Sequence, residues 1–344
     1  MAHRPKLSTV AAAAGVSPAT VSQVLRGTGR ISEETRARVL EAARAVNYLP
    51  DGRAAAMRSG ENREIGLVLH HLANPFNAEL VSGVSDRLER DGYLVSVLDS
   101  RDDAERQERN LRALIANMRG GLIWVPASGT DAATLDLLAA QRLPVVTFLH
   151  RVSPDLDHVE LNNARALRDA VAHLADLGHR RIAFLGGTAP RAPRTDRIAG
   201  YLAAVAERGL GAPLVWPCED SRRGGRDAIL SLRAAHPDIG AVVCNGDMVA
   251  LGACLGLASR GERAGREVSI IGFDDVAEAA LATPALTTLS VMPYDLGRRL
   301  AERLLARMSD PAAAPTTLRI DATLVPRDTT APPSPRRPIR SRRT

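Results

Sequence analysis

The sequence is poor in aromatic residues, in cysteine and in lysine. Aromatic residues make up 3% of its 344 residues, so the hydrophobic cores have to be built mainly from Ala, Leu, Val and Ile. The cysteines are Cys218, Cys244 and Cys254, an odd number without the close spacing of metal ligands, which indicates reduced thiols rather than a disulfide scaffold. No hydrophobic run reaches the length of a membrane span, and the N-terminal residues contain no apolar signal segment. These absences favour a cytoplasmic protein without membrane contact.

The charges are unevenly distributed along the chain. Residues 1–61 contain nine Lys or Arg residues against five Asp or Glu residues, and the segment after Pro335 contains five Arg and no acid. Since the net charge is +6, the remainder of the chain is mildly acidic. A basic N-terminal part on an acidic body favours nucleic-acid contact by the N-terminal part. Lys6 is the only lysine, so phosphate contacts fall mainly to arginines.

The larger part of the chain has an α/β pattern. From residue 65 onwards, strand patterns alternate with helical patterns, which predicts doubly wound parallel sheets. The expected strands are 65–69, 93–98, 121–125, 144–148, 181–185, 214–216, 241–244 and 268–271. The expected helices are 79–90, 104–118, 134–140, 164–177, 197–208, 225–235, 247–259 and 294–308.

The alternation runs in two series, which predicts two sub-domains with a cleft between them. We expect one sub-domain at 62–160 plus 290–325 and the other at 161–289. The Pro- and Arg-rich tail at 331–344 is expected to be disordered, and it lacks the leucine heptads of a helical oligomerisation segment.

Residues 7–25 have the pattern of two short helices joined by a tight turn. Ala11 is expected where the helices approach most closely, and Gly15 follows the first helix, where a left-handed residue is easiest for glycine. Ser17 can cap the second helix, with Pro18 at its first position. This spacing favours a helix-turn-helix, whose second helix lies in the DNA major groove, over an ordinary helical hairpin.

The two faces of the second helix differ in character. Its apolar face comprises Val21, Val24 and Leu25, at helical spacing. The opposite face carries short or polar groups able to approach base edges, namely Ser17, Ala19, Thr20, Ser22 and Gln23. A third helix is expected from Ser32, a natural cap, to the residues before Pro50. Residues 51–58 follow as a linker that Asp51 could cap as a helix but that Gly52 weakens.

Six segments together resemble the LacI/GalR family of bacterial transcription regulators. They are Gly15–Leu25, Asn47–Asp51, Asn74–Phe76, Gly178–Gly187, Ala250–Ala253 and Gly272–Asp275, which occur in the order typical of the family. The resemblance covers residues 5–327. It implies an all-α helix-turn-helix head at 1–49, a hinge helix at 50–61 and an effector-binding and dimerisation domain at 62–330 that is similar to periplasmic binding proteins.

The resemblance also implies a function and its partners. Such a regulator acts as a homodimer on a near-palindromic double-stranded DNA operator, usually as a repressor, and is expected in the cytoplasm, associated with the nucleoid. A small-molecule effector, typically a sugar, controls operator affinity from the cleft. Residues 22–32 and 195–201 look most like the maltose-regulon repressor branch, which favours an α-glucoside-like effector.

The family pattern implies which residues contact DNA. The corresponding positions are Lys6, Thr9, Ser17, Pro18, Ala19, Thr20, Ser22, Gln23, Arg26, Arg30, Ala54 and Met57. Met57 stands where a leucine of the family wedges between base steps and kinks the DNA. The chain departs from the family at the first helix, where Lys6 and Thr9 replace a threonine cap and an aspartate. We therefore expect this cap to be weaker or made differently.

Ligands of α/β sheets bind at the carboxyl ends of the parallel strands, and this rule selects the candidate effector residues. They are Asn74, Phe76, Ser128, His150, Arg197, Glu219, Asp247 and Asp274. The family pattern implies effector contacts for Arg197, in an Arg-x-x-Gly motif, for Asp247 and for Asp274. Gly246 and Leu149 replace an asparagine and an aspartate of the family, which is atypical of a galactoside or purine pocket. Either aspartate of the pair 274–275 could instead cap the next helix, and we favour the effector role for Asp274.

Catalysis receives little support from the sequence. Its eight histidines and three cysteines form no Ser–His–Asp arrangement and no His-Glu-x-x-His motif, and Gly186-Gly187 is not a dinucleotide-binding loop. His70 and His71 could suggest a metal, but adjacent residues of an extended segment point apart. We therefore expect neither enzymatic activity, nor a cofactor, nor a metal. The alternative is a sugar-binding transport component or a sugar enzyme on the same fold, which the basic head and the missing export signal disfavour.

Overall fold

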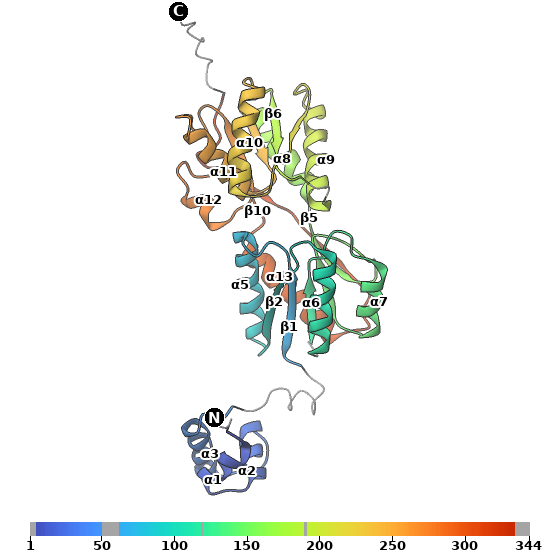
Figure 1. Cartoon of the computed structure of the whole chain (residues 1–344), viewed down its shortest axis with the longest axis vertical. Helices are drawn as coiled ribbons and strands as arrows, with labels where there is room; N and C mark the ends of the chain where they lie inside the picture. The colour runs from blue at the N-terminus through green and yellow to red at the C-terminus, as the bar shows by residue number, and fades with distance from the viewer. Residues whose placement is uncertain (1–4, 50–61, 118–119, 189–190, 334–344) are drawn as a thin grey trace, which may run out of the picture. The chain divides into compact units, whose positions relative to one another are not determined.

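The computed structural model describes residues 5–49, 62–117, 120–188 and 191–333 (Figure 1). These residues belong to two units, residues 1–62 and residues 63–344. The predicted hinge at 51–58, with Ala54 and Met57, and residues 334–344 of the predicted tail lie outside the described residues.

The described part of the first unit forms a small helical bundle. Its helices are α1 (Leu7–Ala14), α2 (Pro18–Arg26) and α3 (Glu33–Ala45). The core uses small and β-branched side chains, namely Val10, Ala11, Ala14, Val21, Val24, Val39, Ala42 and Ala43. Ala11 is 4% exposed, so a larger side chain would have no space there.

The predicted caps of these helices are present. Gly15 has φ +65° at the end of α1, and Ser17 Oγ accepts a hydrogen bond of 3.1 Å from Thr20 N at the start of α2. Ser32 Oγ likewise accepts from Thr35 N over 3.3 Å. At the start of α1, Thr9 Oγ1 accepts from Lys6 N over 3.2 Å. The first helix is thus capped by its third residue rather than by a side chain that precedes it, which is the different cap that the sequence predicts.

The second unit contains two six-stranded sheets with helices on both faces (Figure 1). The first sheet has the order β11-β5-β4-β3-β1-β2, and all its pairings are parallel. Its strands are β1 (Glu64–Leu69), β2 (Leu94–Asp99), β3 (Gly121–Trp124), β4 (Val145–Phe148), β5 (Asp157–Leu161) and β11 (Thr317–Ile320). Helices α5 (Pro75–Glu89) and α13 (Pro293–Ser309) pack on one face, and α6 (Ala104–Ala116) and α7 (Ala132–Ala140) on the other. This sheet and the helices on its two faces form the first sub-domain.

The second sub-domain repeats this arrangement with the strand order β12-β10-β9-β8-β6-β7. Its strands are β6 (Ile182–Leu185), β7 (Leu214–Trp216), β8 (Ala241–Cys244), β9 (Ser269–Asp274), β10 (Thr287–Ser290) and β12 (Thr323–Val325), and β12 alone among them is antiparallel to its neighbour. Its helices are α8 (Asn163–Asp176), α9 (Ala192–Glu207), α10 (Arg222–Ala235), α11 (Asp247–Ala258) and α12 (Ala277–Leu281). The continuous apolar runs of strands such as β6 and β8 fill the core on both faces of the sheet.

The structure adds five short elements that the sequence pattern does not reveal, β5, β10, β11, β12 and α12. The strands among them are only three to five residues long, and Thr or charged residues interrupt their apolar patterns. Residues 323–325 were expected in the first sub-domain, yet they pair with β10 in the second sheet. Ala331, expected at the start of the tail, has a carbonyl oxygen that accepts a hydrogen bond of 3.0 Å from Ser269 Oγ.

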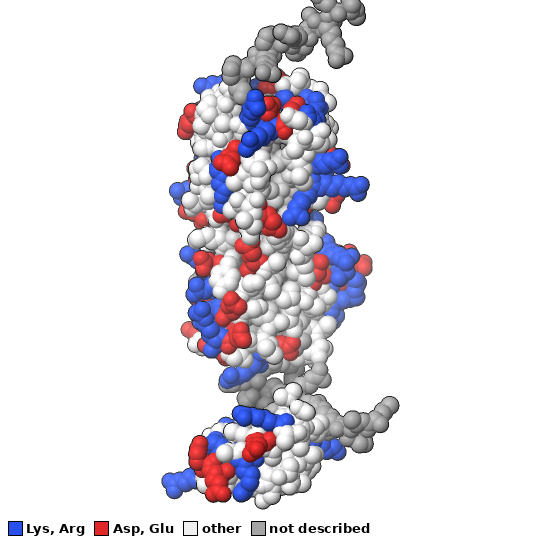
Figure 2. Space-filling model, turned by 90° about the vertical axis from the view of Figure 1, so that its left-hand side faces the viewer, with Lys and Arg blue, Asp and Glu red and all other residues white. Residues whose placement is uncertain are grey.

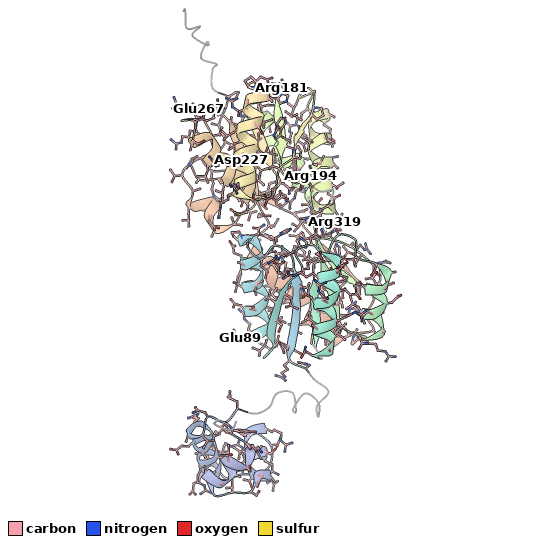
Figure 3. All side chains as sticks on the ribbon, in the orientation of Figure 1. Glu89, Arg181, Arg194, Asp227, Glu267 and Arg319 are labelled. Atoms are coloured by element: carbon pink, nitrogen blue, oxygen red, sulfur yellow. The ribbon has the colours of Figure 1, made fainter. Side chains whose placement is uncertain are left out.

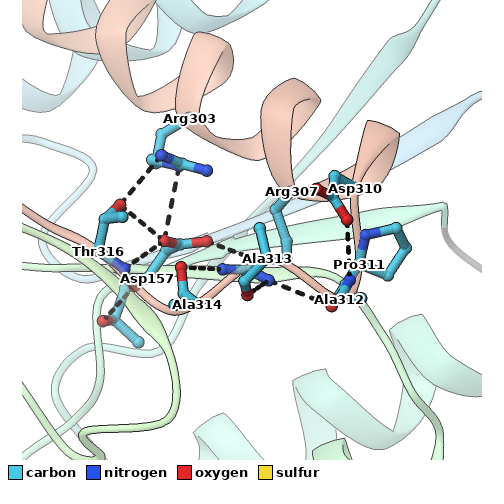
Figure 4. Close-up of polar contacts among 10 residues, drawn as sticks. Asp157, Arg303, Arg307, Asp310, Pro311, Ala312, Ala313, Ala314 and Thr316 are labelled. Atoms are coloured by element: carbon cyan, nitrogen blue, oxygen red, sulfur yellow. Dashed lines mark hydrogen bonds and ion pairs between the residues drawn. The ribbon is translucent and has the colours of Figure 1, made fainter.

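A buried ion-pair cluster fixes the edge of the first sheet (Figure 4). The Asp157 side chain on β5 is fully buried and accepts hydrogen bonds from Arg307 Nε over 2.7 Å and from Thr316 N over 2.8 Å. Arg303 Nε lies 3.6 Å from the same carboxylate. Burial alone would raise the pKa of Asp157, but the bonds from Arg307 and Thr316 hold it below its ordinary value. The cluster ties β5 to α13 and to the segment that leads into β11.

Charged side chains of both signs are interspersed over the face of the second unit that Figure 2 presents, with uncharged residues between them. No helix in the described parts of the chain has the length and hydrophobicity that crossing a membrane requires.

Candidate functional sites

The predicted DNA-contacting residues that the structure describes lie at the surface of the helical unit. Ser17, Pro18 and Ala19 are exposed at the start of α2, and Thr20, Ser22 and Gln23 are half-buried along it. Lys6, Thr9, Arg26 and Arg30 are also exposed.

Two contacts shape the end of this surface. Arg26 Nε donates to the Ser22 carbonyl oxygen over 3.1 Å, which leaves its terminal nitrogens for other partners. The Gln23 side chain lies against Gly29, where a Cβ would come within 3.1 Å of its amide carbon and oxygen. The turn after α2 thus supports the side chain in the middle of the polar face.

A cavity of about 140 Å³ lies between the two sub-domains. One water molecule needs roughly 10–15 Å³ of such space, so the cavity is large enough for a small organic molecule. Its walls are formed by the carboxyl ends of β1, β4, β8 and β9 and by the first turns of α5, α9 and α11. Five of the predicted effector residues line it, namely Asn74, Phe76, His150, Arg197 and Asp274.

Arg197 and Asp274 form the buried base of this cavity, and each is 7% exposed. The Arg197 guanidinium lies 3.5 Å from the centre of the Phe273 ring, its Nε donates to Asn163 Oδ1 over 2.8 Å, and its Nη1 donates to the Asn245 carbonyl oxygen. Burial lowers the pKa of Arg197 and raises that of Asp274 well above its ordinary value, and the attraction between the two opposes both shifts.

The backbone at the base of the cavity is strained. Asp274 has φ +116° and Asp275 has φ +61°, which are unfavourable for residues with a side chain. Asp275 Oδ1 accepts from Arg327 Nη2 over 2.7 Å, and Val276 is the residue that precedes α12. Neither aspartate caps that helix, so the strained turn serves to aim Asp274 into the cavity.

Three predicted effector residues do not line the cavity. Ser128 donates from its backbone N over 2.8 Å to Asp102, and Glu219 is replaced in the wall by its neighbour Asp220. Asp247 is fully buried, and its two oxygens accept from Thr288 Oγ1 over 2.5 Å and from Val276 N over 2.9 Å. Burial raises the pKa of Asp247 to about 7. A carboxylate with both oxygens occupied by its own fold has a structural role.

The sequence patterns did not reveal two further arginines of the cavity wall, Arg191 and Arg194, at the start of α9. Arg191 Nε lies 2.7 Å from Asp102 Oδ2, which joins the second sub-domain to the first. On α5, Glu79 Oε1 accepts from Ala277 N over 3.0 Å and makes a second such link. An arginine at a helix start has no motif of its own, so only the packing of the two sub-domains reveals these residues.

Histidines line the part of the wall that the first sub-domain contributes. The rings of His70 and His150 lie 6.1 Å apart, and those of His70 and His71 lie 5.4 Å apart. Burial lowers the pKa of His70 to about 4 and also lowers that of His150, so both are neutral at neutral pH. The described residues contain no cluster of three or more His, Cys, Asp or Glu side chains suited to a metal ion.

The Gly200 of the Arg197-x-x-Gly200 motif has a packing role. A Cβ at Gly200 would overlap the carbonyl group of Ala164, so glycine allows α9 to contact α8 directly. The motif therefore combines one residue that faces the cavity with one that sets the distance between two helices.

Comparisons with known proteins match this division of the chain. Residues 6–51 match the model of bacterial regulatory proteins of the lacI family, and residues 171–330 match that of the periplasmic binding protein-like domain. The maltose regulon regulatory protein MalI of Escherichia coli (strain K12) is 32% identical over 337 residues, which cover 94% of this chain and 98% of that protein.

Solved structures are similar over nearly the whole chain. The structure of the lac repressor dimer bound to operator and the anti-inducer ONPF has a TM-score of 0.82 and 26% identity, and covers 96% of this chain and 100% of its own. The complex of the transcriptional regulator CelR with cellobiose has a TM-score of 0.70 and 27% identity, and the match covers 95% of this chain and 100% of that chain. A match of both the helical unit and the α/β unit to the same proteins decides against a transport component or an enzyme.

Proposed function

Because the chain belongs to the LacI family of bacterial regulatory proteins, we propose that it represses transcription from a near-palindromic operator under the control of a sugar that binds between its sub-domains. As a member of this family it is a DNA-binding transcriptional regulator and not an enzyme. One observation carries the proposal: the same chain combines a capped α2 with an exposed polar face and a cavity built around Arg197 and Asp274.

The DNA contacts are those of the polar face of α2 and its surroundings. Ser17, Thr20, Ser22 and Gln23 approach base edges, whereas Arg26 and Arg30, with Lys6 and Thr9, contact phosphates. Ala54 and Met57 complete the set from the segment outside the described residues. Gln23 reads adenine, because its amide can donate and accept at the adenine edge at once.

The operator is bound by a homodimer. A single recognition helix contacts only a few base pairs, so two half-sites are needed for specific affinity. The second sub-domain exposes two large apolar side chains at the same surface hollow: Leu255 on α11 is 56% exposed, and Leu281 on α12 is 81% exposed. A second copy of the chain at this hollow would remove their apolar surface from water, which supports a dimer contact there. The related lac repressor was solved as a dimer on operator.

The effector is a sugar held by polar groups at one end and apolar groups at the other. Arg197 and Asp274 offer charge-assisted hydrogen bonds to hydroxyl groups, and Asn74 and His150 add neutral ones. Phe76 supplies an apolar wall for a ring face. A cellobiose complex of the related CelR supports this class of ligand. Such a regulator works in the cytoplasm, on the nucleoid.

Two measurements on the full-length protein test the proposal. Selection from a random DNA library should enrich a near-palindromic site, and fluorescence anisotropy should show that its affinity changes when a sugar is added. A thermal-shift screen of sugars identifies that effector, because a ligand that binds only the folded state raises its stability. A library that yields no enriched site, or a site whose affinity no stabilising sugar alters, would contradict the proposal.

A further inference from the structure

We propose that the effector carries an anionic group, a phosphate or a carboxylate, and that Arg194 binds this group at the N-terminal end of α9. The inference rests on the effector site proposed above and specifies the class of sugar that fits it. Arg194 lines the cavity and lies where the second sub-domain faces the first (Figure 3).

Three arginines face the cavity from the start of α9, and the protein itself occupies the guanidinium groups of two of them. Arg197 donates to Asn163 Oδ1 and to the Asn245 carbonyl oxygen and lies against the Phe273 ring, and the charge of Asp274 counteracts the effect of burial on its pKa. Arg191 pairs with Asp102 over 2.7 Å, and its Nη1 also lies 3.2 Å from His71 Nε2. Arg191 is therefore paired with a carboxylate, and neutral acceptors and an aromatic ring of the protein occupy the guanidinium of Arg197.

Arg194 differs from both. Its Nε donates to the Gly186 carbonyl oxygen over 3.1 Å, a neutral acceptor that fixes the direction of the side chain. Within residues 62–117, 120–188 and 191–333, no carboxylate lies within 4.0 Å of its guanidinium. An arginine keeps its charge at physiological pH and offers two parallel N–H groups to a planar anion. Its terminal nitrogens are thus held in place at the cavity with no anion of the protein to bind.

The surroundings of Arg194 favour an anion further. The residue before α9 is Arg191, whose side chain does not cap the helix, so the positive end of a 16-residue helix lies beside the cavity. In the opposite wall, His70 Nδ1 is buried without a hydrogen-bond partner among the described residues. A neutral imidazole in that position can donate an N–H to an oxygen of the ligand.

Asp220 is the acidic group of the same wall and would oppose an anion. Its Oδ1 is occupied by Gly187 N and Asn245 Nδ2, each at 3.0 Å, so it is held toward its own loop. Removing its charge should then strengthen the binding of an anionic ligand, which gives the proposal a second variant with the opposite sign.

The test compares neutral and anionic compounds on the full-length protein. The probes are inorganic phosphate, glucose, glucose 6-phosphate, gluconate, maltose and maltose 6′-phosphate. Their binding is measured by thermal shift and calorimetry at low and high salt. We expect phosphate or an anionic sugar to bind at least about tenfold tighter than its neutral counterpart, and more weakly at high salt. The relative affinities of phosphate and carboxylate compounds then identify which anion the site prefers.

Variants connect this binding to Arg194. Arg194→Met should weaken the binding of the anionic probe about 10- to 100-fold and leave the neutral sugar within about threefold, and Arg194→Lys should fall between Arg194→Met and the wild type. Asp220→Asn should bind the anion more tightly. Arg168→Met is the matched control, since Arg168 is exposed on α8 and pairs with Glu207.

The proposal is overturned if no anionic probe, inorganic phosphate included, stabilises the protein, or if Arg194→Met binds the anion as the wild type does. Operator binding without effector separates this result from the proposed function. A neutral sugar that releases the operator, from a protein to which no anionic probe binds through Arg194, would leave the regulator intact and refute the anionic effector. Anion binding that depends on Arg194 in a protein without operator affinity would support the site and refute the regulator.

Discussion

The guanidinium of Arg197 lies on the Phe273 ring, 3.5 Å from its centre, and Phe273 directly precedes Asp274. The ring lies against the guanidinium at the base of the cavity, where cation–π attraction partly replaces the water lost on burial. Because one strand end carries both the ring and the carboxylate, a shift of β9 would move both partners of Arg197 together.

Replacing Arg197 should separate effector binding from DNA binding. Arg197→Ala removes a charged donor at the base of the cavity, so the free energy of effector binding should fall by about 1.5–3 kcal/mol and the response should be lost. Operator affinity without effector should stay at the wild-type value, because the helical unit has its own core. Calorimetry measures effector affinity and fluorescence anisotropy measures operator affinity, with Arg168→Ala as control. Wild-type effector affinity in Arg197→Ala would remove this residue from the site.

Replacing Gln23 should change the sequence that the protein selects. Gln23→Arg substitutes a side chain that prefers guanine for one that prefers adenine, so one position in each half-site should change toward G. Discrimination at that position should amount to about 1–3 kcal/mol. Selection from a DNA library measures it, and Gln23→Ala should lose the preference without gaining another. An unchanged preference in Gln23→Arg would mean that Gln23 does not contact a base.

Replacing Met57 tests the predicted wedge in the segment outside the described residues. If its side chain enters a base step, Met57→Ala should weaken operator affinity and reduce DNA bending, and Met57→Leu should retain both. Dimerisation and effector binding should not change in either variant. Gel mobility of permuted operator fragments measures the bend. Bending at the wild-type level in Met57→Ala complexes would show that Met57 only covers a protein contact.

Asp247 should make stability depend on pH. Burial raises its pKa to about 7 in the folded protein, above the ordinary value of about 3.9 in the unfolded chain. The folded state therefore binds the proton more tightly, and the stability that this proton contributes is complete below about pH 4 and is lost as pH rises to about 7. Asp247→Asn cannot ionise, so its stability relative to wild type should increase over this range, by at most about 4 kcal/mol.

Urea unfolding at pH 5 and pH 8 measures this difference. The matched control is Asp227→Asn, because Asp227 is exposed on α10 and should not change the pH dependence. If the free energies of unfolding of wild type and Asp247→Asn change by the same amount between these two pH values, Asp247 does not bind a proton in the folded protein as proposed.

The sequence determined the local structure wherever residues close along the chain fix it. Ser17, Gly15 and Ser32 act within a few residues of their own backbone, and their caps are where the pattern places them. Long apolar strands such as β1 and β9 have a clear signal because both their faces are buried. The family motifs led from these elements to the regulator fold, which the comparisons confirm.

Tertiary structure decided what depends on contacts between distant segments. The strand β12 is only three residues long, too short for a clear pattern, and only its pairing with β10 places it in the second sheet. Asp247 follows β8 at the start of α11 and Asp274 ends β9, so both come close after strands, but Thr288 and Val276 occupy the Asp247 carboxylate, whereas Asp274 has a strained backbone and lines the cavity. Arg194 became a candidate only because, among the described residues, its guanidinium lines the cavity and has no carboxylate within 4.0 Å, which is a property of the folded protein. A sequence specifies which groups can bind, whereas the balance of charges around a cavity is set by side chains that the fold brings together from both sub-domains.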